Sequence, residues 1–273
     1  MKRREYLKRG EPIKTIVEEY RDFDDFINTV NSRDVVFIDG SVQTRERTDS
    51  YFTGVENYNE AVDLLAHGYS ANIERMVKTV KSNTRNGQRV KTERYADVMG
   101  YAPIVPNAIL GVPCSMMNQR KKTVKARVIE IVFNRNCAAH HSTTEIEEYC
   151  CKVVGMIMEL ERKGYRVKLS AAFSVQDTSK KRQYIMTIPV KGESQPLNIK
   201  RMSFALTHPA FQRCLCFDWC ERLPKVVKVG GLGIAIEYCD EIYHRNLENH
   251  IGKNVVMLYH GKDLDEAFKD YLR

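Results

Sequence analysis

The chain has 273 residues, 43% of them hydrophobic and 29% charged, which is typical of a globular protein that can bury a sizeable core. No stretch approaches the roughly 20 apolar residues that a membrane-spanning helix needs, so an integral membrane protein is excluded. The basic residues 1–9 lack the apolar run of a secretory signal, and we interpret them as a tail. Without an export signal, the eight cysteines predict a cytoplasmic protein whose thiols are reduced.

The net charge of +8 is distributed unevenly along the chain. Residues 75–201 carry 24 Lys and Arg against 10 Asp and Glu, a balance of +14, and the rest of the chain balances at −6. Such a basic region attracts phosphate-bearing or acidic partners through long-range electrostatics. The alternative is a solvated basic surface that the acidic flanks partly neutralise.

Helical patterns dominate the first third of the sequence. Pro12 suits the first turn of a helix over residues 13–20, because its missing N–H would have no helical partner there. Apolar residues then recur at helical spacing in residues 23–30, 59–67 and 71–87, with a short strand at 35–38. We therefore treat residues 1–95 as a helix-rich N-terminal extension and residues 96–273 as an α/β sheet domain.

The segment 100–118 is apolar yet carries three prolines and two glycines. Proline removes a backbone donor and fixes φ, so a long regular helix or strand is excluded here. We expect an irregular segment that packs over the core and is able to line one wall of a cleft.

The clearest local pattern lies in residues 126–173, where an apolar strand precedes a helix and a second strand. Ser142 and Glu145 form a capping-box pattern at the start of an amphipathic helix that Gly164 ends. A strand, a helix of about twenty residues and a strand in this order predict two parallel strands joined by a right-handed crossover.

The remaining patterns continue this alternation. Strands are predicted at residues 184–190, 225–229, 234–236 and 255–259, and helices at 198–220, 240–250 and 264–272. Alternating strands and helices favour an α/β fold, with a mostly parallel open sheet and helices on both faces in a Rossmann-like arrangement.

In open α/β sheets, ligands bind beyond the carboxyl ends of the strands, which directs attention to residues 134–141. Cys137 with His140 or His141 suits either a nucleophile and its base or part of a metal site. Alternatively, this polar loop only caps the next helix, or the helix amides hold a phosphate with the help of Arg135. No third catalytic partner is identifiable, and neither a metal nor a cofactor is predicted.

Cys214, Cys216 and Cys220, with His208 and Cys239, would be enough ligands for a zinc site. Their spacing argues against one, because Cys216 and Cys220 share a helix face and Cys214 points elsewhere. We therefore expect cysteines of the hydrophobic core.

Two groups of basic residues are candidates for contact with a nucleic-acid backbone. Cations three and four residues apart form a ridge on the helix predicted at 71–87, and short basic runs lie on predicted loops. The candidates are Arg75, Lys78, Lys81, Arg85, Arg120, Lys121, Lys122, Arg135, Lys180, Lys181 and Arg182. The alternative is a solvated helix face and solvated loops.

Several short motifs resemble an uncharacterised family of tailed-bacteriophage proteins. They are Gly54–Ala61, Gly68–Tyr69, Gly111–Met116, Leu160–Tyr165 and Phe204–Pro209 with Arg213, spread over roughly residues 50–220. That family has no assigned activity, so the resemblance implies a phage-encoded protein that acts inside the host cell. The central unit also resembles a von Willebrand factor A-like arrangement, although residues 134–138 lack the Asp-x-Ser-x-Ser metal motif of that fold.

Two hypotheses of different classes follow. The first is a non-enzymatic accessory or assembly protein that binds a macromolecular partner through its basic central region. Nucleic acid is the first candidate for this partner, and phage proteins are the second. The second is an enzyme that uses the loop from Cys137 to His141. The sequence gives no oligomeric state.

Overall fold

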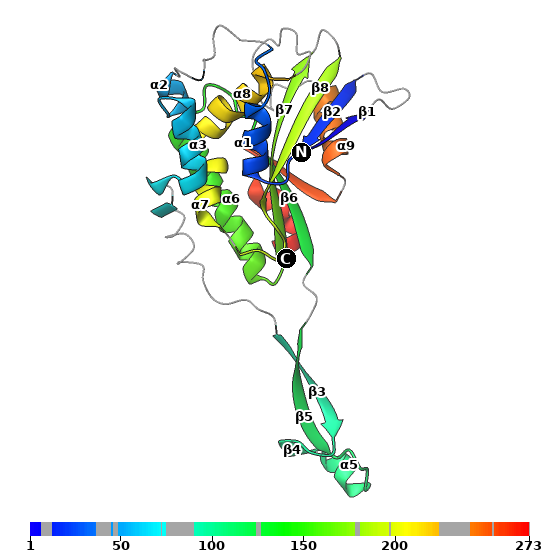
Figure 1. The fold of residues 1–273 in the computed structure, drawn as a ribbon. Coiled ribbons are helices and arrows are strands. Elements are labelled where there is room, and N and C mark those ends of the chain that lie inside the picture. The colour runs from blue at the N-terminus through cyan, green and yellow to red at the C-terminus, as the bar shows by residue number, and fades with distance from the viewer. Residues whose placement is uncertain are drawn as a thin grey trace.

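The structure is a computed structural model that describes residues 1–6, 13–36, 45, 49–71, 73–74, 90–123, 127–177, 181–196, 198–223, 241–252 and 254–272. Within these residues, helices cover a six-stranded sheet, and a three-stranded sheet forms a separate arm (Figure 1). None of the described helices is both long enough and apolar enough to span a bilayer.

The large sheet has the strand order β1-β2-β8-β7-β6-β9, and the small sheet has the order β3-β5-β4. The strands are β1 (Lys2–Tyr6), β2 (Lys14–Glu19), β3 (Val90–Asp97), β4 (Ala102–Pro103), β5 (Met116–Thr123), β6 (Val128–Asn134), β7 (Arg166–Asp177), β8 (Arg182–Lys191) and β9 (Val255–Tyr259). The helices are α1 (Phe23–Asn31), α2 (Ser50–Thr53), α3 (Tyr58–His67), α5 (Val105–Ile109), α6 (Thr143–Arg162), α7 (Ile199–Ala205), the π-helix η1 (Phe211–Cys216), α8 (Phe217–Glu221), α9 (Glu241–Ile251) and α10 (Leu264–Leu272).

The large sheet is mixed, so the mostly parallel Rossmann-like or von Willebrand factor A-like sheet expected from the sequence is wrong. Strand β6 is parallel to β7 and β9, and β2 is parallel to β8, but β7 with β8 and β1 with β2 are antiparallel. Strand β7 continues to Asp177 and β8 begins at Arg182. This connection is much shorter than the dozen or more residues of a parallel crossover, so the two strands form a hairpin.

The N-terminal region is not a helical extension, because its first two elements are strands of the large sheet. Residues 14–19 form β2 instead of the expected helix, and residues 2–6 form β1 instead of a tail. The centre of β2 consists of β-branched residues, which favour a strand, and it is buried on both faces. Ile16 packs in the main core, and Val17 packs in a smaller core with Leu247 of α9. Burial on both faces removes the alternation that distinguishes a strand from a helix.

The central strand–helix–strand prediction is confirmed. Strands β6 and β7 are parallel, with Ile131 opposite Leu169, and α6 connects them. Ser142 and Glu145 form the predicted capping box at the start of α6. The helices predicted around 23–30, 59–67, 240–250 and 264–272 and the strand at 255–259 are also present. The strands predicted at 225–236 and most of the helix at 71–87 lie outside the described residues.

Most of the helices pack on one face of the large sheet (Figure 1). Helices α1, α3, α6, α7 and α10 share one apolar cluster with η1, α8 and that face of the sheet. On the opposite face, Leu247 of α9 packs with Ile185 and Met257. The resulting core is asymmetric, with its main mass between β6–α6–β7 and the helices that contain residues 199–221.

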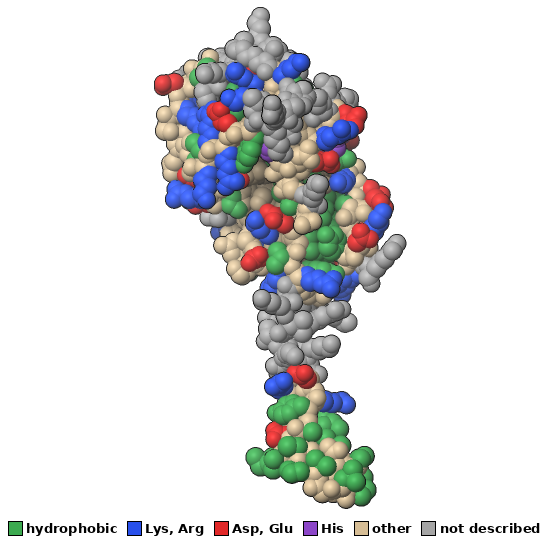
Figure 2. Space-filling model, turned by 90° about the vertical axis from the view of Figure 1, so that its right-hand side faces the viewer, with side chains coloured by type: hydrophobic (Ala, Val, Ile, Leu, Met, Phe, Trp, Pro, Cys, Tyr) green, Lys and Arg blue, Asp and Glu red, His purple; other side chains and the backbone are tan. Residues whose placement is uncertain are grey.

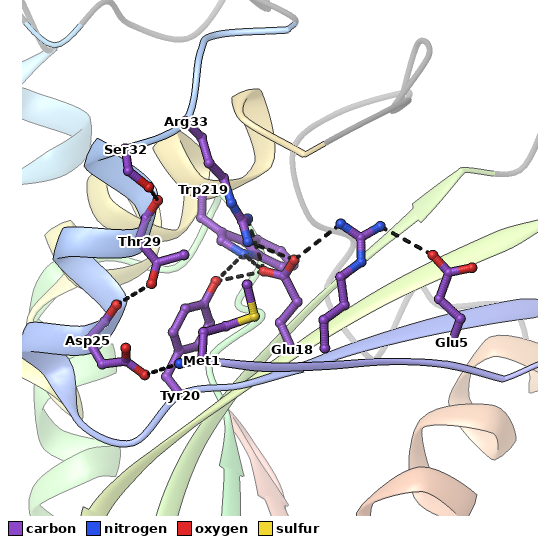
Figure 3. A network of polar contacts seen from close by, with 10 residues as sticks. Met1, Glu5, Glu18, Tyr20, Asp25, Thr29, Ser32, Arg33 and Trp219 are labelled. Atoms are coloured by element: carbon purple, nitrogen blue, oxygen red, sulfur yellow. Dashed lines mark hydrogen bonds and ion pairs between the residues drawn. The ribbon is translucent and has the colours of Figure 1, made fainter.

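Glu18 of β2 is fully buried and accepts hydrogen bonds from three side chains (Figure 3). Arg33 donates twice, at 2.9 and 3.0 Å, the hydroxyl of Tyr20 donates at 2.6 Å, and Nε1 of Trp219 donates at 2.9 Å. Burial alone raises the pKa of Glu18, but the hydrogen bonds from Arg33, Tyr20 and Trp219 outweigh it, so this pKa lies below its usual value. An ionised carboxylate therefore links β2 to the residues after α1 and to α8.

The arm contradicts the expectation that residues 100–118 pack over the core. These residues instead contribute β4, α5 and the beginning of β5. No residue from 93 to 120 is buried, and Figure 1 shows them at the end of the molecule away from the large sheet. The apolar side chains of residues 100–118 therefore lie on the surface of the arm and not in a core.

We expect Glu18→Ala to lower the free energy of unfolding by about 3–5 kcal/mol, because it removes the acceptor of Arg33 and of the buried indole N–H of Trp219. Glu19→Ala is a matched control in the same strand, since the side chain of Glu19 is 41% exposed and pairs with Arg4 at 3.4 Å. Its effect should stay below about 1 kcal/mol. Denaturant unfolding at neutral pH measures both.

The same pair of proteins gives a pH test with a defined sign. Folding lowers the pKa of Glu18, so its contribution to stability is present above the unfolded pKa of about 4.3 and is lost as the pH falls through the folded pKa. The stability difference between wild type and Glu18→Ala should therefore shrink below about pH 4.3. A difference that stays constant over this range would show that Glu18 is not ionised in the folded protein.

Candidate metal centre

Two strand ends of the large sheet meet at the candidate site. Strand β6 continues into the loop of residues 135–141, and β9 continues into His260. The two strands are parallel, with Tyr259 opposite Asn134, so the residues that follow them leave the sheet at the same edge. The strand pairing thus places His260 beside a loop that lies far away in the sequence.

Cys137, His141 and His260 form a compact cluster of metal-binding side chains. One ligand atom from each residue lies within 4.8 Å of the other two. Zinc binds imidazole nitrogen at about 2.0–2.1 Å and thiolate sulfur at about 2.3 Å, so modest side-chain rotations bring all three atoms to one ion. Cys137 is 6% exposed and both histidines are half-buried, which limits competition from water.

His140 lies beside this cluster but contributes no ligand atom to it. Its ring centroid is 4.2 Å from that of His141, and the ring of His141 is in turn 4.2 Å from that of His260. His140 is exposed. Of the three residues that the sequence indicated, the structure therefore brings Cys137 and His141 together and leaves His140 at the edge.

Two buried side chains of η1 hold the loop in place. Arg213, 3% exposed, donates from Nη2 at 3.1–3.3 Å to the carbonyl oxygens of Ala138, Ala139 and His141. Gln212 donates to the carbonyl oxygen of Cys137 at 3.0 Å. Because one helix binds four carbonyl groups of the loop, the positions of Cys137 and His141 are coupled to η1.

Two further polar contacts orient the ends of the loop. Asn136 exchanges hydrogen bonds with the backbone of Ser174 in β7, at 2.7 and 2.9 Å. At the other end, Oε2 of Glu145 lies 3.9 Å from Nδ1 of His141. Hydrogen bonds from Ser142 lower the pKa of Glu145, so this neighbour of His141 is a carboxylate. At 3.9 Å this carboxylate is near the imidazole but does not accept a hydrogen bond from it.

The surroundings of the loop are electropositive. Arg135 is 2% exposed and donates to the carbonyl oxygens of Leu206 and His208. No described carboxylate lies within ion-pair distance of Arg135 or Arg213. Burial lowers the pKa of Arg213, and the charge of Cys137 opposes this effect.

The other cysteines have a different environment. Cys214, Cys216 and Cys220 are all buried, which confirms the prediction that they belong to the core. Burial raises the pKa of Cys214 to about 12 and those of Cys216 and Cys220 well above the usual value. These three residues are protonated thiols that pack as small apolar side chains.

The structure does not gather the predicted nucleic-acid-binding residues that it describes on one surface. Arg75, Lys78, Lys81, Arg85 and Lys180 lie outside the described residues, as do the side chains of Lys121 and Lys122. Arg135 is buried and donates to the carbonyl oxygens of Leu206 and His208. Arg120 is on the arm, 63% exposed, and pairs with Glu93 at 3.0 Å. Lys181 and Arg182 are at the β7–β8 hairpin, exposed and half-buried respectively.

His260 is the site residue that the sequence patterns did not single out. It directly follows the strand predicted at 255–259, and Gly261 comes next. The rule that ligands bind beyond strand ends applies to it as well as to the 134–141 loop. Only the strand order, which places β9 beside β6, connects the two positions.

The fold and the cluster define a mixed α/β protein with two histidines and a cysteine at the carboxyl ends of two adjacent parallel strands. The chain belongs to the family described as a domain of unknown function, DUF7192, whose model matches residues 4–270. The comparisons of this chain with curated proteins and with solved structures found no match. The arm, the cluster and all of the large sheet except the first two residues of β1 lie within this span.

We expect Arg213→Met to lower the free energy of unfolding by about 2–4 kcal/mol, because it keeps the apolar stem but removes the donors of several buried carbonyl groups. The same substitution should accelerate amide hydrogen exchange in residues 137–141. Arg162→Met is the control, since Arg162 is 45% exposed and pairs with Glu159 at the end of α6. It should change stability by no more than about 1 kcal/mol. Equal effects of the two substitutions would argue against the role of Arg213 in the loop.

Proposed function

We propose that the protein binds one Zn²⁺ ion through Cys137, His141 and His260. The observation that carries this proposal is the convergence of three ligand atoms within 4.8 Å from two strand ends. A thiolate with two imidazoles is a donor set for zinc, whereas Mg²⁺ and Ca²⁺ prefer oxygen ligands. The carboxylate of Glu145 is an acidic group close to a proposed ligand, 3.9 Å from His141.

The number of ligands also indicates a reaction class. Structural zinc sites have four protein ligands, whereas catalytic sites have three and keep a position for water or substrate. Zinc held by three ligands supplies a Lewis acid and an activated water. We therefore propose that the protein catalyses metal-dependent hydrolysis. This is a specific form of the enzymatic hypothesis, which uses the loop from Cys137 to His141. In this site Arg213 and Gln212 fix the backbone that carries two of the ligands.

Metal-free protein should bind Zn²⁺ at one ion per chain, measured by competition with a chromophoric chelator. Cys137→Ser, His141→Ala and His260→Ala should each weaken binding by roughly 100-fold or more, because each removes one of three ligands. His140→Ala is the matched control, since His140 is adjacent and exposed, and it should keep the wild-type affinity. Affinity should fall as the pH is lowered, because the ligands must lose their protons.

Cobalt substitution identifies the ligands independently of affinity. Co²⁺ in place of Zn²⁺ should give a thiolate-to-metal absorption band that Cys137→Ser removes and His140→Ala preserves. Unfolding experiments on the same variants show whether each is folded. A wild-type affinity in folded His260→Ala, or a band that survives Cys137→Ser, would refute the ligand assignment.

We also propose, from charge, a partner-binding role that is separate from the metal site. The balance of +14 over residues 75–201 supports an anionic macromolecule, with nucleic acid as the first candidate. The sequence resemblance adds a context, that of a phage-encoded protein inside its host cell. The enzyme and the nucleic-acid binder are not exclusive, because they use different residues.

Charge reversal at Arg75, Lys78, Lys81 and Arg85 should weaken binding to duplex DNA or RNA and reduce its salt dependence, by a slope of about 0.9 for each phosphate that the protein no longer neutralises. Four cations outside this region are the controls, and their side chains are at least half exposed: Arg4, Arg21, Arg245 and Lys269. Reversing the charge of these four controls should weaken nucleic-acid binding less than reversing Arg75, Lys78, Lys81 and Arg85. Fluorescence anisotropy over a salt series measures both sets, and binding that does not depend on salt would exclude this role.

A further inference from the structure

The arm of residues 90–123 is a small sheet without a buried core. Strands β3 and β5 pair from Val90 opposite Thr123 to Asp97 opposite Met116, and β4 lies at the other edge of β5. None of residues 93–120 is buried. Figure 2 shows apolar side chains gathered at the far end of the arm, which we call the tip and define as residues 98–117. A three-stranded sheet with no covering layer gains little stability alone, so another surface is expected to cover it.

The tip is uncharged and apolar. Residues 98–119 contain no Asp, Glu, Lys, Arg or His. Seven large apolar side chains of the tip are 39–79% exposed: Val98, Met99, Tyr101, Val105, Ile109, Leu110 and Val112. Scattered apolar residues are normal on a surface, but a continuous group of this size marks an interaction site.

The backbone of the tip satisfies many of its own hydrogen bonds. The amides that donate within the tip are those of Tyr101, Ile104, Ala108, Leu110, Gly111 and Val112. Pro103, Pro106 and Pro113 have no amide hydrogen to satisfy. Asn107 donates its side-chain amide to the carbonyl oxygen of Cys114 at 3.3 Å. A segment with these groups paired loses little when it leaves water for an apolar phase.

Cations lie behind the tip, along the strands that carry it. Residues 90–123 have five Lys and Arg against two acidic residues, a balance of +3. Arg94 and Arg120 are exposed. Arg120 is four residues from Met116, which corresponds to about 13 Å along a strand. Apolar groups of peripheral proteins enter a bilayer by about 5–10 Å, so an inserted tip leaves these cations on the headgroup side of the bilayer, where anionic lipids attract them.

We propose that the tip binds the surface of an anionic lipid bilayer, with its apolar side chains among the acyl-chain ends and the arm cations at the phosphates. A single apolar anchor gives only marginal, reversible binding, and a basic cluster is the second signal that makes it stable. The charge argues against a second copy of the chain as the occupant, because tip-to-tip contact would bring two arms of +3 together. This contact is independent of the metal site.

Cosedimentation with vesicles tests the two parts of the contact separately. The full chain should bind vesicles of phosphatidylcholine with phosphatidylglycerol, and bind pure phosphatidylcholine much more weakly. Ile109→Asp with Leu110→Asp should weaken binding at least about tenfold, and each of Arg94→Gln, Lys121→Gln and Lys122→Gln by about fivefold. Tyr51→Asp is the control for the apolar part, since Tyr51 is 96% exposed on α2, and Lys152→Gln on α6 is the control for charge. Neither control should change binding.

A dye at the tip reports insertion directly. Cys114 is exposed, whereas the other cysteines that the structure describes are buried, so an environment-sensitive fluorophore can be attached to it in a Cys239→Ser background. Anionic vesicles should shift its emission to the blue. An unchanged emission, or vesicle binding that survives Ile109→Asp with Leu110→Asp, would overturn the proposal. Self-association without vesicles that this double substitution abolishes would overturn it in favour of a second copy.

Discussion

The parallel pairing of β9 with β6 is the constraint on which the metal site depends. The register sets Tyr259 opposite Asn134, so the residues that follow each strand emerge side by side. A slip of one residue would send the side chains of β9 to the opposite face of the sheet. The ligands on the loop depend in turn on η1, whose Arg213 and Gln212 bind the loop backbone. The cluster is therefore a consequence of strand order and helix placement together.

Buried charge is distributed in two contrasting ways in this fold. Glu18 is neutralised locally, by Arg33 and by hydrogen bonds from two aromatic side chains, and it joins the N-terminal strands to the helical layer. Arg135 and Arg213 instead donate to backbone carbonyl groups and have no described carboxylate partner. A buried cation without an anion is costly, and the hydrogen bonds to carbonyl oxygens offset part of this cost. Arg213 at the same time holds the loop backbone that carries Cys137 and His141.

Local sequence features predicted the β6–α6–β7 unit, because the capping box at Ser142 and the lengths of the segments leave few alternatives. Long-range features were not predictable in the same way. Strand order is set by tertiary packing, so neither the hairpin after Asp177 nor the position of His260 beside Cys137 follows from periodicity. Residues 100–118 were expected to pack over the core, but apolar residues also form interaction surfaces, so this pattern does not decide between core and arm.

X-ray absorption at the zinc edge of the zinc-loaded full chain measures the ligand set most directly. We expect one sulfur at about 2.3 Å and two imidazole nitrogens at about 2.0–2.1 Å, with one further light atom. The sulfur should disappear in Cys137→Ser. A spectrum without sulfur, or with two or more sulfur ligands, would contradict the assignment of Cys137, His141 and His260, since these residues contribute a single thiolate.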